Sequence, residues 1–232
     1  MQTESGPVAL VAGASGMVGT ELVRVLAASG DYRRVIALSR RPLSIEAPNL
    51  ANRILRFENL ENDLRGLVCS DAYCCLGTTL RQAGTQQAFR AVDHDLILRF
   101  ARFAQAAGAK TMVVISAAGA NAGSRNFYLR VKGETELALE ALHFRSLHLM
   151  QPALILGSRK QWRITEMVGR VVMPLVNPLL LGRYERWRAI PARTLAAAMR
   201  TAGRSGRLGV HRHTWRALRT LAQPVTAAKP RL

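Results

Sequence analysis

A tyrosine and a lysine four residues apart, Tyr128 and Lys132, are the side chains of this sequence best suited to proton transfer. Residues four apart share one face of a helix, so the ammonium group would lie beside the phenol. A nearby cation stabilises a phenolate, and we expect Lys132 to lower the pKa of Tyr128 from about 10. Ser116, twelve residues before Tyr128, would hydrogen-bond a substrate oxygen while Tyr128 donates or accepts the proton. Such a short motif also occurs by chance in amphipathic helices, so the surrounding sequence decides whether the pair is catalytic.

A glycine-rich turn near the N-terminus supplies that context. The apolar run at 7–12 has the length of a strand and leads into the turn at 13–19, after which 20–28 is expected to be helical. Glycines allow a tight turn and a close approach of backbone to pyrophosphate, and the helix N-terminus favours phosphate. The spacing Gly-x-x-Gly-x-x-Gly is a variant of the dehydrogenase fingerprint. We expect the cofactor to contact Gly13, Ser15, Gly16, Met17, Val18 and Gly19.

A second apolar run, 35–38, ends in Ser39, Arg40 and Arg41. At this point of a dinucleotide fold, an acidic residue holds the ribose 2′-hydroxyl or an arginine accepts a 2′-phosphate. No acid follows the run, and two guanidinium groups beside a hydroxyl suit a dianionic phosphate. The segment therefore predicts NADP rather than NAD, with a solvated basic turn as the alternative.

Short apolar runs alternate with longer helical patterns along the chain. Further strands are expected at 54–57, 72–76, 111–115 and 146–150, and helices at 86–107 and 127–142. This alternation predicts an α/β fold, a doubly wound parallel sheet with helices on both faces. Ligands of such sheets bind beyond the carboxyl ends of the strands, where this chain carries Gly13, Ser39, 77–79 and Ser116. We place an NADP-binding Rossmann core at 1–156 and a small basic substrate-side or interaction region at 157–232.

The positive charge is concentrated in the last third of the chain. Residues 157–232 hold 16 basic and 2 acidic residues, a net +14 out of +18 for all 232 residues. Such a surface attracts polyanions, so we expect weak contact with polyanions or anionic membranes, unless the charge is merely a solvated surface. Aromatic residues in this region are widely spaced, so specific nucleic-acid recognition is not expected.

The most apolar stretch, 167–181, contains Pro174 and Pro178 and is interrupted by Arg170 and Asn177, so it does not read as a membrane span. It could line an apolar substrate pocket, form the interface of a homodimer, or dip into a membrane surface. The chain has no run of eighteen apolar residues and no signal-like N-terminus, which predicts a soluble, cytoplasmic protein.

The cysteines and histidines do not indicate a metal site. Cys69, Cys74 and Cys75 are expected to be reduced, with two of them inside an apolar strand. His211 and His213 are expected to be exposed, and no nearby ligands support metal binding there.

Several motifs together resemble the atypical short-chain dehydrogenase/reductases, specifically the Tat-interacting-protein oxidoreductase-like branch. They are the turn at 13–19, Cys74 to Thr79, Val92 to Asp95, Ser116, and Tyr128 to Glu134; the resemblance runs from about Val8 to Gly157 and returns at 188–191 and 196–199. It implies a Rossmann fold, NADP(H) binding that also uses Leu76, Gly77, Thr78 and Lys132, and catalytic positions at Ser116, Tyr128 and Lys132. One departure is Asp93, because many short-chain reductases carry an asparagine that supports a water relay in the helix after the fourth strand.

Two functions follow from these observations. The first is an NADP(H)-dependent oxidoreductase that moves a hydride to or from a small carbonyl or alcohol substrate, with Tyr128 as general acid or base. The second is a regulatory or scaffold protein that binds NADPH without robust turnover and engages a partner or an anionic membrane through its basic last third. Turnover on a panel of carbonyl compounds separates the two.

Overall fold

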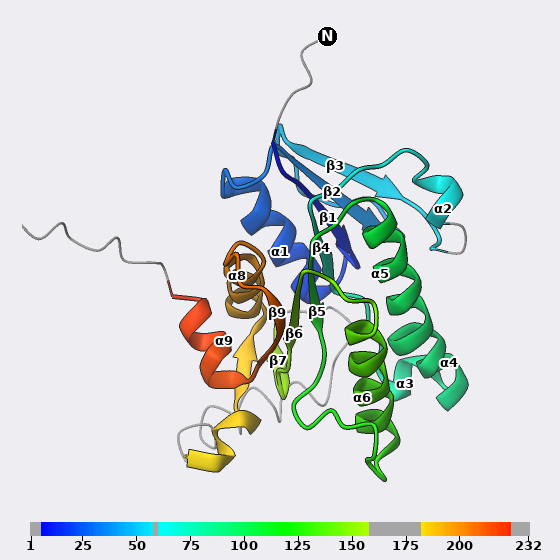
Figure 1. Ribbon diagram of the computed structural model, residues 1–232, viewed down its shortest axis with the longest axis vertical. Coiled ribbons are helices and arrows are strands. Elements are labelled where there is room, and N and C mark those ends of the chain that lie inside the picture. Colours follow the sequence, from blue (N-terminus) through cyan, green and yellow to red (C-terminus); the bar gives the residue numbers. More distant parts are fainter. Residues whose placement is uncertain (1–5, 58–59, 158–181, 224–232) are drawn as a thin grey trace, which may run out of the picture.

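The computed structural model describes residues 6–57, 60–157 and 182–223. Its centre is a parallel sheet of seven strands in the order β3-β2-β1-β4-β5-β6-β9 (Figure 1). The strands are β1 (Val8–Ala12), β2 (Arg34–Ser39), β3 (Leu50–Ile54), β4 (Asp71–Cys74), β5 (Thr111–Ile115), β6 (Ser146–Met150) and β9 (Gly209–His213). A separate parallel pair joins β7 (Leu154–Leu156) and β8 (Ala189–Pro191). The parallel α/β sheet predicted from the sequence is confirmed.

Helices cover both faces of the sheet (Figure 1). They are α1 (Met17–Ala28), α2 (Leu60–Asp63), α3 (Leu80–Ala83), α4 (Gln86–Arg90), a π-helix (Ala91–Leu96), α5 (Ile97–Ala106), α6 (Phe127–Glu140), a 3₁₀ helix (Gly182–Trp187), α8 (Ala192–Gly203) and α9 (Trp215–Leu221). One face packs on α1, α8 and α9, with Leu22 and Leu195 fully buried. The other packs on α2, α5 and α6, with Leu60 and Leu139 fully buried. The central strands β1, β2, β4, β5 and β6 are therefore largely buried on both sides, which explains their apolar runs.

The strand order reverses between β1 and β4. From β1 the chain moves outward to β2 and β3, whereas β4, β5 and β6 follow on the other side. Parallel sheets bind ligands in the crevice where this reversal occurs, beyond the carboxyl ends of the strands. The segments after β1 and β4 meet there, since the Cys75 amide donates to the Ala12 carbonyl at 2.9 Å.

Three elements differ from the sequence-based expectation. The strand expected at 54–57 is wrong: β3 ends at Ile54, and Phe57 has a positive φ of 62° that breaks an extended chain. Leu55 and Phe57 are apolar because they close the core from a loop. The helix expected at 86–107 contains the π-helix, which inserts an irregular turn around Asp93. Strand β9 was not predicted, because an edge strand of sequence GVHRH has little apolar signal.

The last third of the chain adds to the same sheet. Strand β9 pairs with β6, and α8 packs beside α1. The apolar stretch 167–181 lies outside the described residues, so its three interpretations stay predictions, as does the division at residue 156. No helix among residues 6–57, 60–157 and 182–223 is long and apolar enough to span a bilayer.

Candidate active site

The glycine turn is built on contacts that only glycine permits. Gly13 follows β1 with φ +75°, and a Cβ there would lie 2.7 Å from the backbone of Cys75. A Cβ on Gly19 would lie 2.1 Å from the Gly13 carbonyl oxygen, so α1 packs directly on the turn. These are two of the three functions of fingerprint glycines, the tight turn and the close packing of helix on strand. The turn thus leaves a backbone cradle that a nucleotide pyrophosphate fits.

The N-terminus of α1 points its free amides into this cradle. Gly16 caps the helix in an extended conformation without a side-chain hydrogen bond, and the first turn carries no acidic residue. Unpaired N–H groups and the helix dipole both favour an anion at this end. A pocket of about 470 Å³ adjoins the turn, and it is lined by Ser15, Gly16, Met17, Thr20, Glu21, Arg24, Leu156, Gly157, Pro191, Ala192 and Arg193.

The basic segment expected to bind a 2′-phosphate lies directly beside the turn. Ser39 is the last residue of β2, and the Ala14 amide donates to the Leu38 carbonyl at 3.1 Å. Arg40 and Arg41 are both exposed. The Ser39 hydroxyl is already engaged, because it donates to the Arg41 carbonyl at 2.6 Å and accepts from the Asn52 side chain at 2.8 Å. Ser39 therefore shapes the loop, and the two guanidinium groups remain the phosphate ligands we propose.

Lys132 forms a buried ion pair with Asp93. Its Nζ lies 2.7 Å from Asp93 Oδ1, and the side chains are only 5% and 1% exposed. The other carboxylate oxygen accepts from the Thr78 amide at 2.7 Å, and the Thr135 hydroxyl donates to the Asp93 carbonyl at 2.9 Å. Asp93 thus ties α6 to the segment after β4. Burial acts to lower the pKa of Lys132, but Asp93, followed by Tyr128, raises it above its ordinary value.

Tyr128 lies one turn before Lys132 on the same side of α6, which Asn126 caps through the Leu129 amide at 3.2 Å. Its ring packs against the buried Phe89 ring, with centroids 5.6 Å apart. Burial raises the pKa of Tyr128, Lys132 lowers it and Asp93 raises it, and the net direction is upward. The expected lowering of the Tyr128 pKa is therefore wrong, because burial outweighs the lysine charge and Asp93 adds to the upward shift.

Ser116 points to a carboxylate that the sequence did not indicate. Its hydroxyl donates to Glu136, a buried residue one turn beyond Lys132 on α6. The Gln151 side chain donates to both oxygens of Glu136 at 2.9 and 3.1 Å, and Arg212 Nε donates at 3.2 Å. Ser116, Lys132 and Glu136 line one small internal cavity between β5 and α6. The structure thus brings Ser116 together with Lys132 and Glu136, and Tyr128 lies one turn before Lys132 on α6.

Sequence reasoning missed Glu136 and the ion pair of Asp93. Their only local signal is helical spacing, since Tyr128, Lys132 and Glu136 recur every four residues. Thr79, next to the expected cofactor segment, caps α3 by accepting from the Gln82 amide at 3.1 Å. The expectation that His213 is exposed is wrong: it is 4% exposed and hydrogen-bonded to another histidine.

Comparisons with known proteins show the family to which the chain is related. The NAD dependent epimerase/dehydratase family matches residues 9–123. Protein HTATIP2 of Rattus norvegicus is 32% identical over 193 residues, 82% of this chain and 78% of that protein. The mitochondrial protein FMP52 of Saccharomyces cerevisiae is 28% identical over 208 residues, 87% of this chain and 85% of its own length.

Solved structures share the fold. Human epimerase family protein SDR39U1 with NADPH superposes with a TM-score of 0.59 at 18% identity, covering 89% of this chain and 74% of that one. MoeE5 in complex with UDP-glucose and NAD superposes with a TM-score of 0.65 at 19% identity, covering 90% of this chain and 75% of that one.

Fold and site together define an NAD(P)-binding protein of the short-chain dehydrogenase/reductase type. Within that class, the chain belongs to the atypical short-chain dehydrogenase/reductases, in the branch that contains HTATIP2 and FMP52. The cytoplasmic location expected from the sequence is contradicted, because several fungal relatives are named as mitochondrial proteins. The expectation failed because it used only the missing signal and apolar segments, which do not distinguish the two compartments.

Proposed function

We propose that this protein is an NADP(H)-dependent oxidoreductase that acts on a small carbonyl or alcohol substrate. The observation that carries the proposal is the buried ion pair of Lys132 and Asp93, which joins the half-buried Tyr128 side of α6 to the segment after β4. A buried ion pair costs several kcal/mol in desolvation, and perturbed ionisable groups in a cleft are typical of functional sites. The bound nicotinamide would supply or accept the hydride.

Tyr128 would transfer the proton. In reduction its phenol would protonate the substrate oxygen, and in oxidation its phenolate would remove the hydroxyl proton. Lys132 stabilises the phenolate, while Asp93 holds the ammonium group charged and in place within its buried site.

Ser116 would position the substrate oxygen. Because its hydroxyl proton is directed to Glu136, its oxygen can accept a hydrogen bond from a substrate alcohol as the site stands. Donation to a carbonyl oxygen requires the hydroxyl to turn away from Glu136. Glu136 is therefore a positioning residue for Ser116.

The coenzyme preference is tested with charge reversal. Arg40→Glu with Arg41→Glu should weaken NADPH binding far more than NADH binding, because only NADPH carries the 2′-phosphate. Equal losses for the two coenzymes, measured by fluorescence titration, would refute the assignment to NADP. Arg102→Glu with Arg145→Glu is the matched control, since both are exposed and lie away from the turn.

The activity is tested by NADPH oxidation on a panel of aldehydes and ketones. Tyr128→Phe should abolish turnover and leave NADPH binding within a few-fold of the original, because only the proton donor is removed. Turnover that survives Tyr128→Phe would refute the assigned chemistry. Tyr184→Phe is a matched control that changes a phenol elsewhere in the chain.

One observation favours a second function, an NADPH-binding regulatory or scaffold protein that engages a partner or an anionic membrane through residues 157–232. The raised pKa of Tyr128 and the charge pairing of Lys132 leave the phenol less activated than the bare motif suggests. Tight NADPH binding without turnover on the whole panel would select this function.

A further inference from the structure

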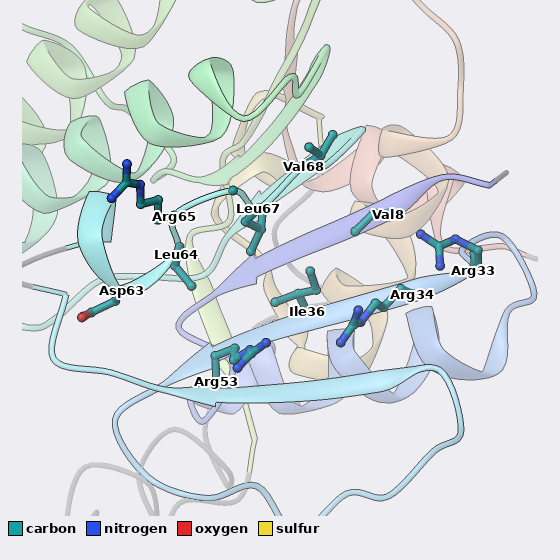
Figure 2. A pocket seen from close by; sticks show the side chains of 11 residues that line it. Val8, Arg33, Arg34, Ile36, Arg53, Asp63, Leu64, Arg65, Leu67 and Val68 are labelled. Atoms are coloured by element: carbon teal, nitrogen blue, oxygen red, sulfur yellow. The ribbon is translucent and has the colours of Figure 1, made fainter. Parts of the chain in front are cut away.

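A second hollow lies on the sheet face that carries α2, at the edge formed by β2 and β3. It has a volume of about 540 Å³, and Figure 2 shows its lining. Four arginines surround it, and we call the four together the arginine groove: Arg33, Arg34, Arg53 and Arg65. None of the motifs assigned to the coenzyme or to proton transfer contributes to it.

Strand register explains why the arginines share one face. Val8 is paired with Arg34, and Leu38 with Arg53, so these side chains leave the sheet on the side of the buried Leu38. Figure 2 shows Arg34 and Arg53 on neighbouring strands, on either side of Ile36. Arg53 is opposite Leu38, which lies four residues beyond Arg34 on β2. The two arginines are therefore about 13 Å apart along the strands.

The charges of Arg34, Arg53 and Arg65 are poorly compensated within the described residues. Asp63 is the one carboxylate in the lining, and in Figure 2 it points away from Arg34 and Arg53. Within the described part of the chain, Arg34, Arg53 and Arg65 form none of the ion pairs, although all three are exposed. Some exposed arginines elsewhere do have acidic partners, such as Arg24 with Glu21 at 2.8 Å.

The groove runs along β2 and β3 from Arg34, at the end far from the glycine turn, to Arg53, which is opposite Leu38 near the carboxyl end of β2. Arg34 begins β2, whereas the Arg40 and Arg41 pair follows its last residue, about 17 Å further on. Its floor is apolar, formed by Val8, Ile36 and Leu64. A volume in the range of small-molecule sites, a cationic wall and an apolar floor suit a compact ligand that is anionic at one end.

We propose that the arginine groove binds a soluble small molecule carrying two or more linked phosphoryl groups. Planar guanidinium forks match phosphate oxygens in pairs, and the spacing of Arg34 and Arg53 favours a ligand longer than one phosphate. Linked phosphoryl groups can contact Arg34 and Arg53 at the same time and reduce the electrostatic repulsion between the two guanidinium groups. Orthophosphate reaches only one.

The test is calorimetric titration of the full chain with tripolyphosphate at low salt, with orthophosphate for comparison. Tripolyphosphate should bind more tightly than orthophosphate, and Arg34→Gln with Arg53→Gln should weaken it roughly a hundredfold, about tenfold per charge-assisted contact. The same variant should keep its NADPH affinity, which also reports that it is folded. Arg34→Lys with Arg53→Lys should give an intermediate loss, because charge remains without the fork.

Two controls separate this site from the coenzyme site and from charge alone. Arg40→Gln with Arg41→Gln should weaken NADPH and leave tripolyphosphate binding intact. Arg102→Gln with Arg145→Gln removes the same charge from exposed positions elsewhere and should change neither. Tripolyphosphate binding that survives loss of Arg34 and Arg53, or that disappears only with Arg40 and Arg41, would overturn the proposal. Binding to phosphatidylserine vesicles without binding to tripolyphosphate would overturn it as well.

Discussion

Acidification should destabilise this protein through two buried imidazoles, His148 of β6 and His213 of β9. His148 Nδ1 and His213 Nε2 are 2.9 Å apart, and His148 Nε2 lies 2.9 Å from the Ser146 hydroxyl. Since Ser146 donates to the Arg207 carbonyl, it accepts from His148 Nε2–H, and Nδ1 must then accept from His213. A second proton on His148 would set two N–H groups against each other.

The expected magnitude follows from linkage. Burial, with smaller contributions from neighbouring cations and imidazoles, lowers the pKa of His148 to about 3 and that of His213 to about 4. The unfolded chain takes up these protons near pH 6.5, so stability is complete above that value and falls as the pH drops towards the folded pKa values. At about pH 5 each histidine has lowered the free energy of unfolding by about 2 kcal/mol. Solvent screening at the sheet edge reduces the summed loss for the two histidines to about 2–4 kcal/mol.

The assay is urea unfolding between about pH 7.5 and pH 5, a range that brackets the unfolded histidine pKa. His148→Gln with His213→Gln keeps hydrogen-bonding side chains but removes both titrating rings, so its unfolding free energy should vary much less with pH. His143→Asn is the matched control: it removes an exposed histidine, and asparagine tolerates the positive φ of 54° at that position.

Identical pH dependence in the original chain and the double variant would refute the reasoning. The comparison of slopes matters more than absolute stability, because any substitution in the buried pair also changes packing. The consequence reaches the active site, since the His213 carbonyl accepts from the Gln151 amide at 2.9 Å and Gln151 holds Glu136.

Two further predictions concern the network around the site, and a third concerns the packing of α8 against Tyr73. Asp93→Asn removes the anion that raises the pKa of Tyr128, so the limb of the pH–rate profile that reports the phenol should move to lower pH; an unchanged profile would contradict the role given to Asp93. Glu136→Ala should cost about 1–3 kcal/mol in urea unfolding and reduce turnover, because it leaves buried Ser116 and Gln151 groups without their acceptor. Glu140→Ala, which removes the other carboxylate bound to Arg212 but is more exposed, should cost less than about 1 kcal/mol, and an equal cost would argue against the buried network. Gly203→Ala should destabilise the fold by about 1–3 kcal/mol through overpacking and so lower the melting temperature, because the new Cβ would lie 2.2 Å from the Tyr73 hydroxyl. Gly206→Asn is the control for a glycine substitution in the same segment, because a Cβ at position 206 would have nothing within 4 Å.

Local patterns were enough to predict two central strands and the helix at the cofactor cradle. The strands at 111–115 and 146–150 have the expected bounds, and α1 ends at Ala28 as predicted but begins at Met17, within the expected turn. These elements are specified by apolar runs of strand length and by glycines whose backbone requirements are local. The loop at Leu55 and Phe57 misled the same reasoning, because core-closing residues are apolar whether or not they lie in a strand.

The electrostatic state of the site could not be predicted in the same way. Helical spacing brings Tyr128 and Lys132 to one side of α6, but it does not show what faces them. Burial of the Tyr128 ring reverses the expected direction of its pKa. Asp93, which the π-helix brings to Lys132 from a segment far away in the sequence, adds to that upward shift.

The sequence by itself determined the parallel sheet, the glycine cradle, and the placement of Ser116 at a strand end with Tyr128 and Lys132 on the helix that follows. Periodicity and backbone conformation act over a few residues, so they can be read along the chain. Only the tertiary structure decided the partners: Asp93 for Lys132, Glu136 for Ser116, and β9 for β6. Those contacts depend on packing and strand register between distant segments, which no local spacing encodes.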